Sequence, residues 1–364
     1  MQTPKHSFEF KQKSQDFYVS ENLPFQLSWQ GEAFFVQISK RNITTHDIID
    51  HLRENLGITR MSLGIAGLKD KKAIAKQWIS IWDRALNKAG GEKEFLNSLS
   101  EICKVVSTGR HHTPMNMSTP ITNTFHITFK ATKNLGQEEK ERAKAIVDNY
   151  LNEGYPNLFG SQRFGINGRN STQWYEIMSG KSKEKFNKSD TIFKLQAYAS
   201  MLFNDMVKKR TKDAVELMDG DILSRTDAGQ IQYGQRNSNK SVTLLNLDNR
   251  TDFFFTPTSQ GTELEYDPKT MHLTCPVPGF NTALANKNTE AGKREAAFLA
   301  RHHIQKKNMK VFKERKVFGL RRPIRVKPSN TRSQYNTDDL MIDFTLPSGS
   351  YASIVFDKLI EILQ

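Results

Sequence analysis

The chain contains few cysteines and no long apolar run. Only Cys103 and Cys275 occur among its 364 residues, and they show neither the spacing of a zinc site nor that of a disulfide framework. No run of about 18 apolar residues exists, which argues against a transmembrane helix. The first residues also lack the apolar stretch of a secretory signal. We therefore expect a cytoplasmic protein without membrane or metal partners.

Several catalytic signatures are missing as well. The sequence has no G-x-x-x-x-G-K-[ST] phosphate loop and no G-x-G-x-x-G after a predicted strand. It also has neither H-E-x-x-H nor C-x-x-C. An RNA methyltransferase or a metal-dependent nuclease would need a cofactor loop or a metal cluster, so both of these functions are disfavoured.

Positive charge is abundant. Lys and Arg number 53 against 39 Asp and Glu, a net charge of +14. Such a balance favours a polyanionic partner, because each neutralised phosphate releases counterions. Ten of the basic residues lie between Lys306 and Lys327, with Glu314 as the single acid. A solvated basic face without a partner is the alternative. The residues that we expect to contact nucleic acid are Arg163, Lys306, Lys307, Arg315, Arg321 and Arg322.

The apolar periodicity predicts a mixed α/β (α+β) fold. Alternation predicts strands at 34–40, 77–82 and 124–129. A stripe at Ile48, Ile49, Leu52 and Leu56 predicts a helix capped by Thr45 and ended by Gly57. Two more helices are expected at 137–153 and 193–210, and short strands between 220 and 300. The last strand is expected at 350–356, followed by a short terminal helix.

Two dense clusters of small, polar and charged residues stand out. The first, residues 66–73, places Asp70 among Lys69, Lys71 and Lys72; the second covers residues 157–165. An Asp beside lysines is commonly a solvated turn or a helix cap. Neighbouring cations also lower the pKa of a carboxylate, which suits a nucleophile or a group that stabilises a sugar cation. The residues alone indicate nucleic-acid binding, with carboxylate chemistry as an open possibility.

Three motifs in this chain resemble the signatures of the TruD family of tRNA pseudouridine synthases. The first is Gly67-Leu68-Lys69-Asp70-Lys71, followed by Ala73 and Gln77-Trp78. The second is Asn157-x-Phe159-Gly160-x-Gln162-Arg163-Phe164-Gly165, and the third is Phe344-x-Leu346-Pro347-x-Gly349-Ser350-Tyr351-Ala352. Softer matches are Leu202-Phe203-Asn204, Asp219-Gly220-Asp221 and Arg321-Arg322. The resemblance covers about residues 8 to 360.

The resemblance implies a catalytic Asp at Asp70 that works without metal or cofactor. The implied reaction isomerises uridine to pseudouridine in RNA: the base detaches from the ribose, rotates and rejoins through carbon. Attack on the ribose, its deprotonation and addition to the base are all open roles for the Asp. Because the target base must leave its stack, an aromatic contact is needed. By resemblance, Phe125 packs against the flipped ring and Asn123 holds the Asp70 loop or the substrate. Lys11, Gln77 and Phe344 are further substrate-binding candidates.

The resemblance also implies an architecture and a substrate. A pseudouridine synthase catalytic domain with a largely antiparallel sheet would comprise residues 1–168 and 318–364, interrupted by an inserted TruD-specific domain at 169–317. The expected substrate is a uridine in the D-stem of tRNA, at position 13 of glutamate tRNA, and the expected state is a monomer. A non-catalytic tRNA-binding protein or tRNA folding chaperone on the same scaffold is the alternative function.

Overall fold

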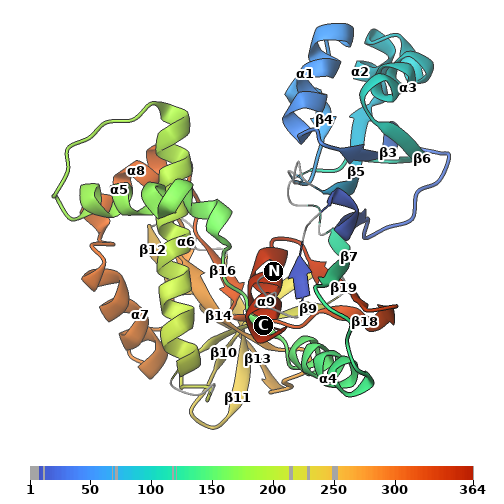
Figure 1. Cartoon of the computed structure of the whole chain (residues 1–364). Helices are drawn as coiled ribbons and strands as arrows, with labels where there is room; N and C mark the ends of the chain where they lie inside the picture. The colour runs from blue at the N-terminus through green and yellow to red at the C-terminus, as the bar shows by residue number, and fades with distance from the viewer. Residues whose placement is uncertain are drawn as a thin grey trace. The chain divides into compact units, whose positions relative to one another are not determined.

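The computed structural model describes residues 8–10, 13–67, 69, 73–116, 119, 121–212, 216–227, 230–247 and 253–363. The chain forms two compact units (Figure 1). Unit 1 comprises Met1–Glu153, Lys327–Gly349 and Asp357–Gln364, and unit 2 comprises Gly154–Val326 and Ser350–Phe356. The assignment of residues 1–168 and 318–364 to catalysis, and of 169–317 to an inserted domain, stays a prediction.

Unit 1 is built on one mixed, largely antiparallel sheet. Its order is β18-β19-β7-β2-β5-β3-β6, with β1 paired to β7 and β4 to β5. Only β2 and β5 run parallel among the described pairs of this sheet. The strands are β1 (Phe8–Phe10), β2 (Phe17–Asn22), β3 (Ala33–Arg41), β4 (Leu63–Gly64), β5 (Ile74–Trp82), β6 (Lys104–His111), β7 (Thr122–Ala131), β18 (Ser329–Asn336) and β19 (Asp339–Pro347). The three strands predicted in this region are confirmed.

Helices complete unit 1. They are α1 (Thr45–Leu56), α2 (Asp83–Lys88), α3 (Gly91–Ile102) and α4 (Gln137–Glu153), with short 3-10 turns η1 (Ser14–Asp16) and η2 (Arg60–Ser62). Ile48 and Leu52 of α1 and Leu99 of α3 share a buried cluster with strand β3. Gly57 ends α1 in the left-handed conformation, at φ 66°, as predicted.

The cap of α1 is Thr44 and not Thr45. The Thr44 side chain accepts the backbone N–H of Asp47 at 3.0 Å, and the Asp47 carboxylate accepts the N–H of Thr44 at 2.7 Å. This reciprocal capping box satisfies two backbone donors that a helix start leaves without partners. Thr45 is thereby released for another contact, described below.

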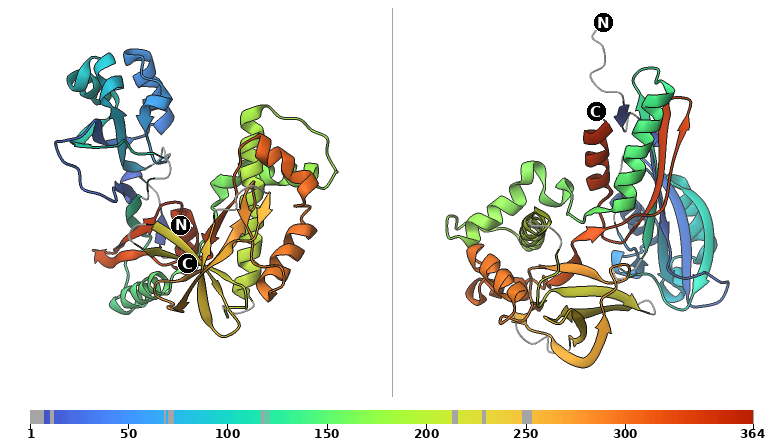
Figure 2. Two further views of the ribbon diagram at one scale, coloured as in Figure 1. Left: turned by 180° about the vertical axis from the view of Figure 1, so that it is seen from behind. Right: turned by 90° about the horizontal axis from the view of Figure 1, so that it is seen from below.

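Unit 2 packs helices against a six-stranded antiparallel sheet of order β13-β11-β10-β9-β14-β16 (Figure 2). Its strands are β9 (Ile222–Asp227), β10 (Gln230–Arg236), β11 (Ser241–Asn246), β13 (Thr258–Glu265), β14 (His272–Val277) and β16 (Leu320–Pro323). Two further pairs join β12 (Phe254–Phe255) to β15 (Thr282–Ala283) and β8 (Tyr155–Pro156) to β17 (Arg325–Val326). The helices are η3 (Ser161–Phe164), η4 (Ile166–Gly168), α5 (Arg169–Met178), α6 (Lys188–Lys212), α7 (Glu290–Arg301) and α8 (Lys306–Glu314). Leu202 and Met206 of α6 share a buried cluster with Leu223 and Leu273 of the sheet.

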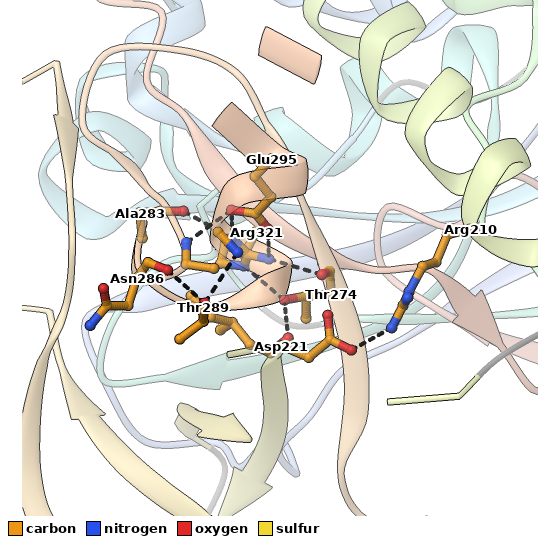
Figure 3. A network of polar contacts seen from close by, with 11 residues as sticks. Arg210, Asp221, Thr274, Ala283, Asn286, Thr289, Glu295 and Arg321 are labelled. Carbon is orange, nitrogen blue, oxygen red and sulfur yellow. Dashed lines mark hydrogen bonds and ion pairs between the residues drawn. The ribbon is translucent and has the colours of Figure 1, made fainter. Parts of the chain in front are cut away.

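A buried network of charges ties the elements of unit 2 together (Figure 3). Arg321 of β16 pairs with Glu295 of α7 at 2.7 Å. The same guanidinium donates to the carbonyl oxygens of Thr274 and Ala283, at 2.9 and 3.1 Å. A second buried ion pair joins Arg210 to Asp221. The Arg321 side chain thus connects α7, β14 and β15 to its own strand, β16.

The prediction of a last strand at 350–356 is wrong. Residues Ala352–Leu363 form helix α9, and the last strand is β19. Val355, Phe356, Leu359 and Leu363 are its buried positions. Their spacing of one, three and four residues is helical, and it outweighs the β propensity of Ile354 and Val355. None of the helices, within the part of the chain that is described, is long and apolar enough to cross a membrane.

Candidate active site

One face of the unit 1 sheet brings the predicted substrate residues together. Asn123 of β7 lies opposite Glu21 of β2, and Phe125 lies opposite Phe344 of β19. Val19 pairs with both Phe125 and Ala75, so Gln77, two residues beyond Ala75, shares this face. Four of the predicted substrate residues, Gln77, Asn123, Phe125 and Phe344, therefore share one face of the sheet, and their contacts with substrate stay a prediction.

In the connection between β4 and β5, two described residues, Gly67 and Lys69, are held by buried side chains. The Gln77 side chain donates to the carbonyl oxygen of Gly67 at 2.6 Å. The Thr45 hydroxyl accepts the N–H of Lys69 at 3.2 Å and donates to Gln77 Oε1 at 2.9 Å. Lys40 donates to the Lys69 carbonyl oxygen at 3.1 Å. Because Lys40, Thr45 and Gln77 are at most 1% exposed, the backbone on either side of Leu68 is held rigidly.

The Lys69 ammonium is held by two partners. It lies 3.0 Å from Glu21 Oε1 and donates to the Asn123 side-chain oxygen. Glu21 is 1% exposed, and its other oxygen accepts the N–H of Trp78 at 2.8 Å. Burial raises the pKa of the Glu21 carboxyl, against the opposing effects of Lys69 and of the Trp78 N–H. Asn123 thus fixes the residue directly before Asp70.

An aromatic row supports the Asn123 side of the site. The Phe125 ring stacks on Phe344 at 5.3 Å and on Phe17 at 6.0 Å, with both interplanar angles at 24°. Phe125 is 7% exposed and Phe344 is fully buried. Phe344 therefore packs against Phe125 and supports its ring. That Phe125 stacks on a substrate base stays a prediction.

Some predicted site residues lie outside the described residues. Asp70 and Lys11 are among them, so the structure says nothing of their geometry. Lys306 and Lys307 begin helix α8, and their side chains are likewise outside the description. Their proposed roles rest on the sequence.

The predicted RNA-contacting arginines occupy different environments in unit 2. Arg315 follows the end of α8 and is half-buried. Arg163 donates to Ser200 at 3.2 Å and lies 5.7 Å from the Phe159 ring centre. Arg321 is 6% exposed within the Glu295 network. A phosphate contact from Arg321 would require breaking a buried ion pair, so we remove it from the RNA-contact set.

Arg322 is also tied into the interior of unit 2. It donates to Asn157 Oδ1 at 2.6 Å and lies 4.5 Å from the Phe159 ring centre. Burial lowers the pKa of its guanidinium to about 10, so it remains charged at neutral pH. Asn204 exchanges two hydrogen bonds with the backbone of Phe159, at 2.8 and 3.0 Å. Tyr351 packs on the same ring at 5.6 Å.

The second motif therefore has a structural role in unit 2. Its residues contact Asn204 and Arg322 of the softer matches and Tyr351 of the third motif. Gly160 permits this close packing, because a Cβ there would lie 2.4 Å from Ser353 Oγ. Arg322 is 9% exposed and hydrogen-bonded to Asn157, so a phosphate contact would require breaking a buried hydrogen bond, and we leave Arg322 out of the RNA-contact set as well.

The sequence reasoning did not identify Glu21, Lys40, Thr45 or Lys69 as members of the site. A signal for Glu21 was present: it follows Phe17 and Val19 on the inward side of an alternating strand, where an acid needs a partner. Among the described residues, no group of three or more His, Cys, Asp or Glu could hold a metal ion. The buried polar contacts that hold Gly67 and Lys69 make this part of unit 1 the candidate active site.

Comparison with known proteins specifies the class. The model of the family tRNA pseudouridine synthase D (TruD) matches residues 1–184 and 184–359. The tRNA pseudouridine synthase D of Haemophilus influenzae (strain 86-028NP) is 26% identical over 362 residues, covering 98% of this chain and 95% of that protein. A Thermus thermophilus enzyme of the same name is 26% identical over 357 residues, with 97% and 89% covered. The enzyme of that name from Nitratiruptor sp. is 34% identical over 206 residues, 56% of this chain and 54% of that protein.

A solved structure shares the fold. The crystal structure of a TruD protein from Methanosarcina mazei matches with a TM-score of 0.59 and 18% identity, covering 99% of this chain and 95% of that one. This likeness confirms the mixed α/β fold class. The chain belongs to the tRNA pseudouridine synthase D family, a family of isomerases that modify tRNA.

Proposed function

We propose that this protein converts uridine 13 in the D-stem of glutamate tRNA to pseudouridine, with Asp70 as the catalytic carboxylate. The observation that carries the proposal is the double anchoring of the Asp70 loop. Gly67 is fixed by Gln77, and Lys69 is fixed through both its backbone and its ammonium. Catalysis by one carboxylate depends on placing it accurately, and these contacts supply that placement at the flanks.

The proposed reaction needs no co-substrate. Isomerisation breaks a C–N glycosidic bond and forms a C–C bond between the same base and ribose, so no water or electron is consumed. The carboxylate must be ionised and close to the sugar or the base. Glu21 forms an ion pair with the Lys69 ammonium, and this pair fixes the residue directly before Asp70.

Substrate contacts are proposed for the same sheet face. Phe125 is the candidate to pack against the flipped uracil, with Phe344 supporting it from the next strand. Base extrusion costs a few kcal/mol, which stacking against an aromatic ring offsets in part. Asn123 accepts a hydrogen bond from the Lys69 ammonium and lies two residues before Phe125 on β7.

The tRNA backbone is proposed to bind the basic segment 306–327 through Lys306, Lys307, Arg315 and the exposed Lys313, together with Arg163. After the removal of Arg321 and Arg322, the expected set retains Arg163, Lys306, Lys307 and Arg315. We add Lys313, because its side chain is exposed on the same segment. Binding should weaken steeply with salt, since each phosphate contact releases counterions.

The test uses unmodified glutamate tRNA transcripts with uridine or cytidine at position 13. Pseudouridine at position 13 of the first transcript and none in the second supports the proposal. Modification at another uridine would contradict the proposed position in the tRNA and would still support the proposed reaction. Tight binding to both transcripts without any product would favour the non-catalytic RNA-binding function.

A further inference from the structure

Unit 2 contains a hollow of about 310 Å³ that the proposed reaction does not use. Its walls come from β9, β10, β12, β15 and β16, and include Tyr233, Phe255 and Leu320. Ligand pockets of small molecules span roughly 300–1,000 Å³, so this hollow accommodates one planar ring with its sugar.

Two large apolar side chains stand exposed at this hollow. Phe318 is 58% exposed and Leu320 is 52% exposed, and both line it. Exposed aromatic rings beside a preformed hollow are typical of a contact surface, because burying them on binding is favourable. The pair therefore requires an occupant with an apolar face.

The backbone around Phe318 is fixed. The Gly319 N–H donates to the Phe280 carbonyl oxygen at 2.7 Å, and the Phe280 N–H donates to Val317 at 2.9 Å. A Cβ at Gly279 would lie 2.4 Å from the Gly319 nitrogen, so only glycine permits this approach. The Phe280 ring lies 5.9 Å from the Phe318 ring. Phe318 is thus held outward without the ordering cost that a mobile ring would incur on binding.

The charge beside the hollow is positive. Lys313 Nζ lies 5.2 Å from the centre of the Phe280 ring, the neighbour of Phe318. Exposed Lys316 and half-buried Arg315 follow in the chain. An occupant that presents a flat apolar ring on an anionic backbone fits this combination, and an unpaired nucleotide of RNA has both features.

A polar group is also present at the hollow. Asn281 lines it, and its side-chain oxygen is buried with no hydrogen-bond partner in the described part of the chain. The residue adopts a left-handed backbone, at φ 62°. A base edge carries N–H donors that would satisfy this oxygen, so a base removes a cost that an aliphatic occupant would leave.

We propose that this hollow is a nucleobase pocket of unit 2, which takes one unpaired base of the bound RNA. Phe318 stacks on the base, Asn281 hydrogen-bonds its edge, and Lys313 with its neighbours attracts the adjoining phosphates. The inference rests on the proposed function only in that the RNA is the tRNA substrate.

The test measures binding and not turnover. Dissociation constants are determined for an unmodified glutamate tRNA transcript and for a blunt RNA duplex without unpaired bases. The variants are Phe318→Ala, Phe318→Trp and, as a matched control, Phe193→Ala, which removes a 44% exposed ring elsewhere in the same unit. Phe318→Ala should weaken tRNA binding roughly 5- to 150-fold, because base stacking is lost. Phe318→Trp should restore it, and Phe193→Ala should leave it unchanged.

Two features separate stacking from a general loss of RNA affinity. Phe318→Ala should leave duplex binding unchanged and should not alter the slope of log Kd against log salt, since no charge is removed. Equal tRNA affinity of wild type and Phe318→Ala would overturn the pocket, as would an equal loss on duplex and tRNA. Because binding is read without turnover, absence of pseudouridine formation would count against the proposed function and leave this result intact.

Discussion

The ammonium of Lys69 lies 3.0 Å from the Oε1 atom of Glu21, a carboxylate that is itself 1% exposed. Lys69 directly precedes Asp70, so this pair fixes the residue before the proposed catalytic carboxylate. Glu21 also holds the backbone of Trp78 in β5. The strand that begins after the loop and the residue before Asp70 are thereby tied to a single buried side chain.

Glu21→Gln should impair catalysis more than binding. The amide removes the negative partner of a largely buried ammonium, which we expect to cost about 1–3 kcal/mol of stability, less than a fully buried pair because Lys69 retains some exposure. The turnover rate at saturating tRNA should fall at least tenfold, because the loop loses its fixed position. Single-turnover kinetics and chemical unfolding measure both effects.

The control for Glu21 is Glu54→Gln, which removes a carboxylate that is 71% exposed. It should change neither rate nor stability by a measurable amount. A Glu21→Gln enzyme with the wild-type turnover rate would show that the ion pair does not position the loop.

Removal of Arg321 should affect stability and leave the salt dependence of tRNA binding unchanged. Arg321→Gln leaves Glu295 buried without its ion-pair partner, at a cost of about 3–5 kcal/mol. The double variant Lys313→Gln/Arg315→Gln should instead reduce the slope of log Kd against log salt by roughly 1.5–2, since two phosphate contacts are lost. A reduced slope with Arg321→Gln in a folded protein would restore Arg321 to the RNA-contact set.

Truncation before Phe344 should unfold unit 1. β19 lies between β18 and β7 in the sheet, and Phe344 and Leu346 are at most 1% exposed. Deleting 344–364 removes half of this inner strand, together with helix α9. Calorimetry should show no cooperative transition for unit 1. A truncated chain that keeps the full unfolding enthalpy would contradict the placement of β19.

His302 should contribute to acid instability. Burial lowers the pKa of its ring from the usual 6.5, so the unfolded chain binds a proton that the folded chain resists. Stability from this group is present above pH 6.5 and is lost as pH falls through the folded pKa. Thermal midpoints of wild type and His302→Asn between pH 5 and 8 should differ in slope on the acid side. Parallel curves of thermal midpoint against pH for the two proteins would show that His302 does not cause the acid instability.

Much of the fold could be predicted because its elements repeat apolar residues with clear periods. The helix 137–153 matches α4 at both ends, and β5 and β7 contain the predicted strands. The error at 350–356 arose where β-branched residues occupy helical positions, so only packing decides the structure. The cap at Thr44 was missed because Thr44 and Thr45 offer the same hydroxyl and only the backbone distinguishes them.

The site could be predicted only in part. The family resemblance pointed to Gln77, Asn123 and Phe125, which share one sheet face. Glu21 and Lys40 could not be found by motif, because their roles depend on which strands are neighbours in the sheet. The burial of Arg321 and Arg322 could not be predicted either, because a basic run in sequence does not show which of its side chains point inward.

We propose that Asp70 is the residue that carries the isomerisation of a tRNA uridine. The most direct measurement maps pseudouridine in total tRNA after incubation with the wild-type protein and with Asp70→Asn, alongside tRNA binding by both. We expect a new D-stem pseudouridine with the wild type, none with the variant, and equal tRNA affinity for both proteins. The same modification in the presence of Asp70→Asn would contradict it.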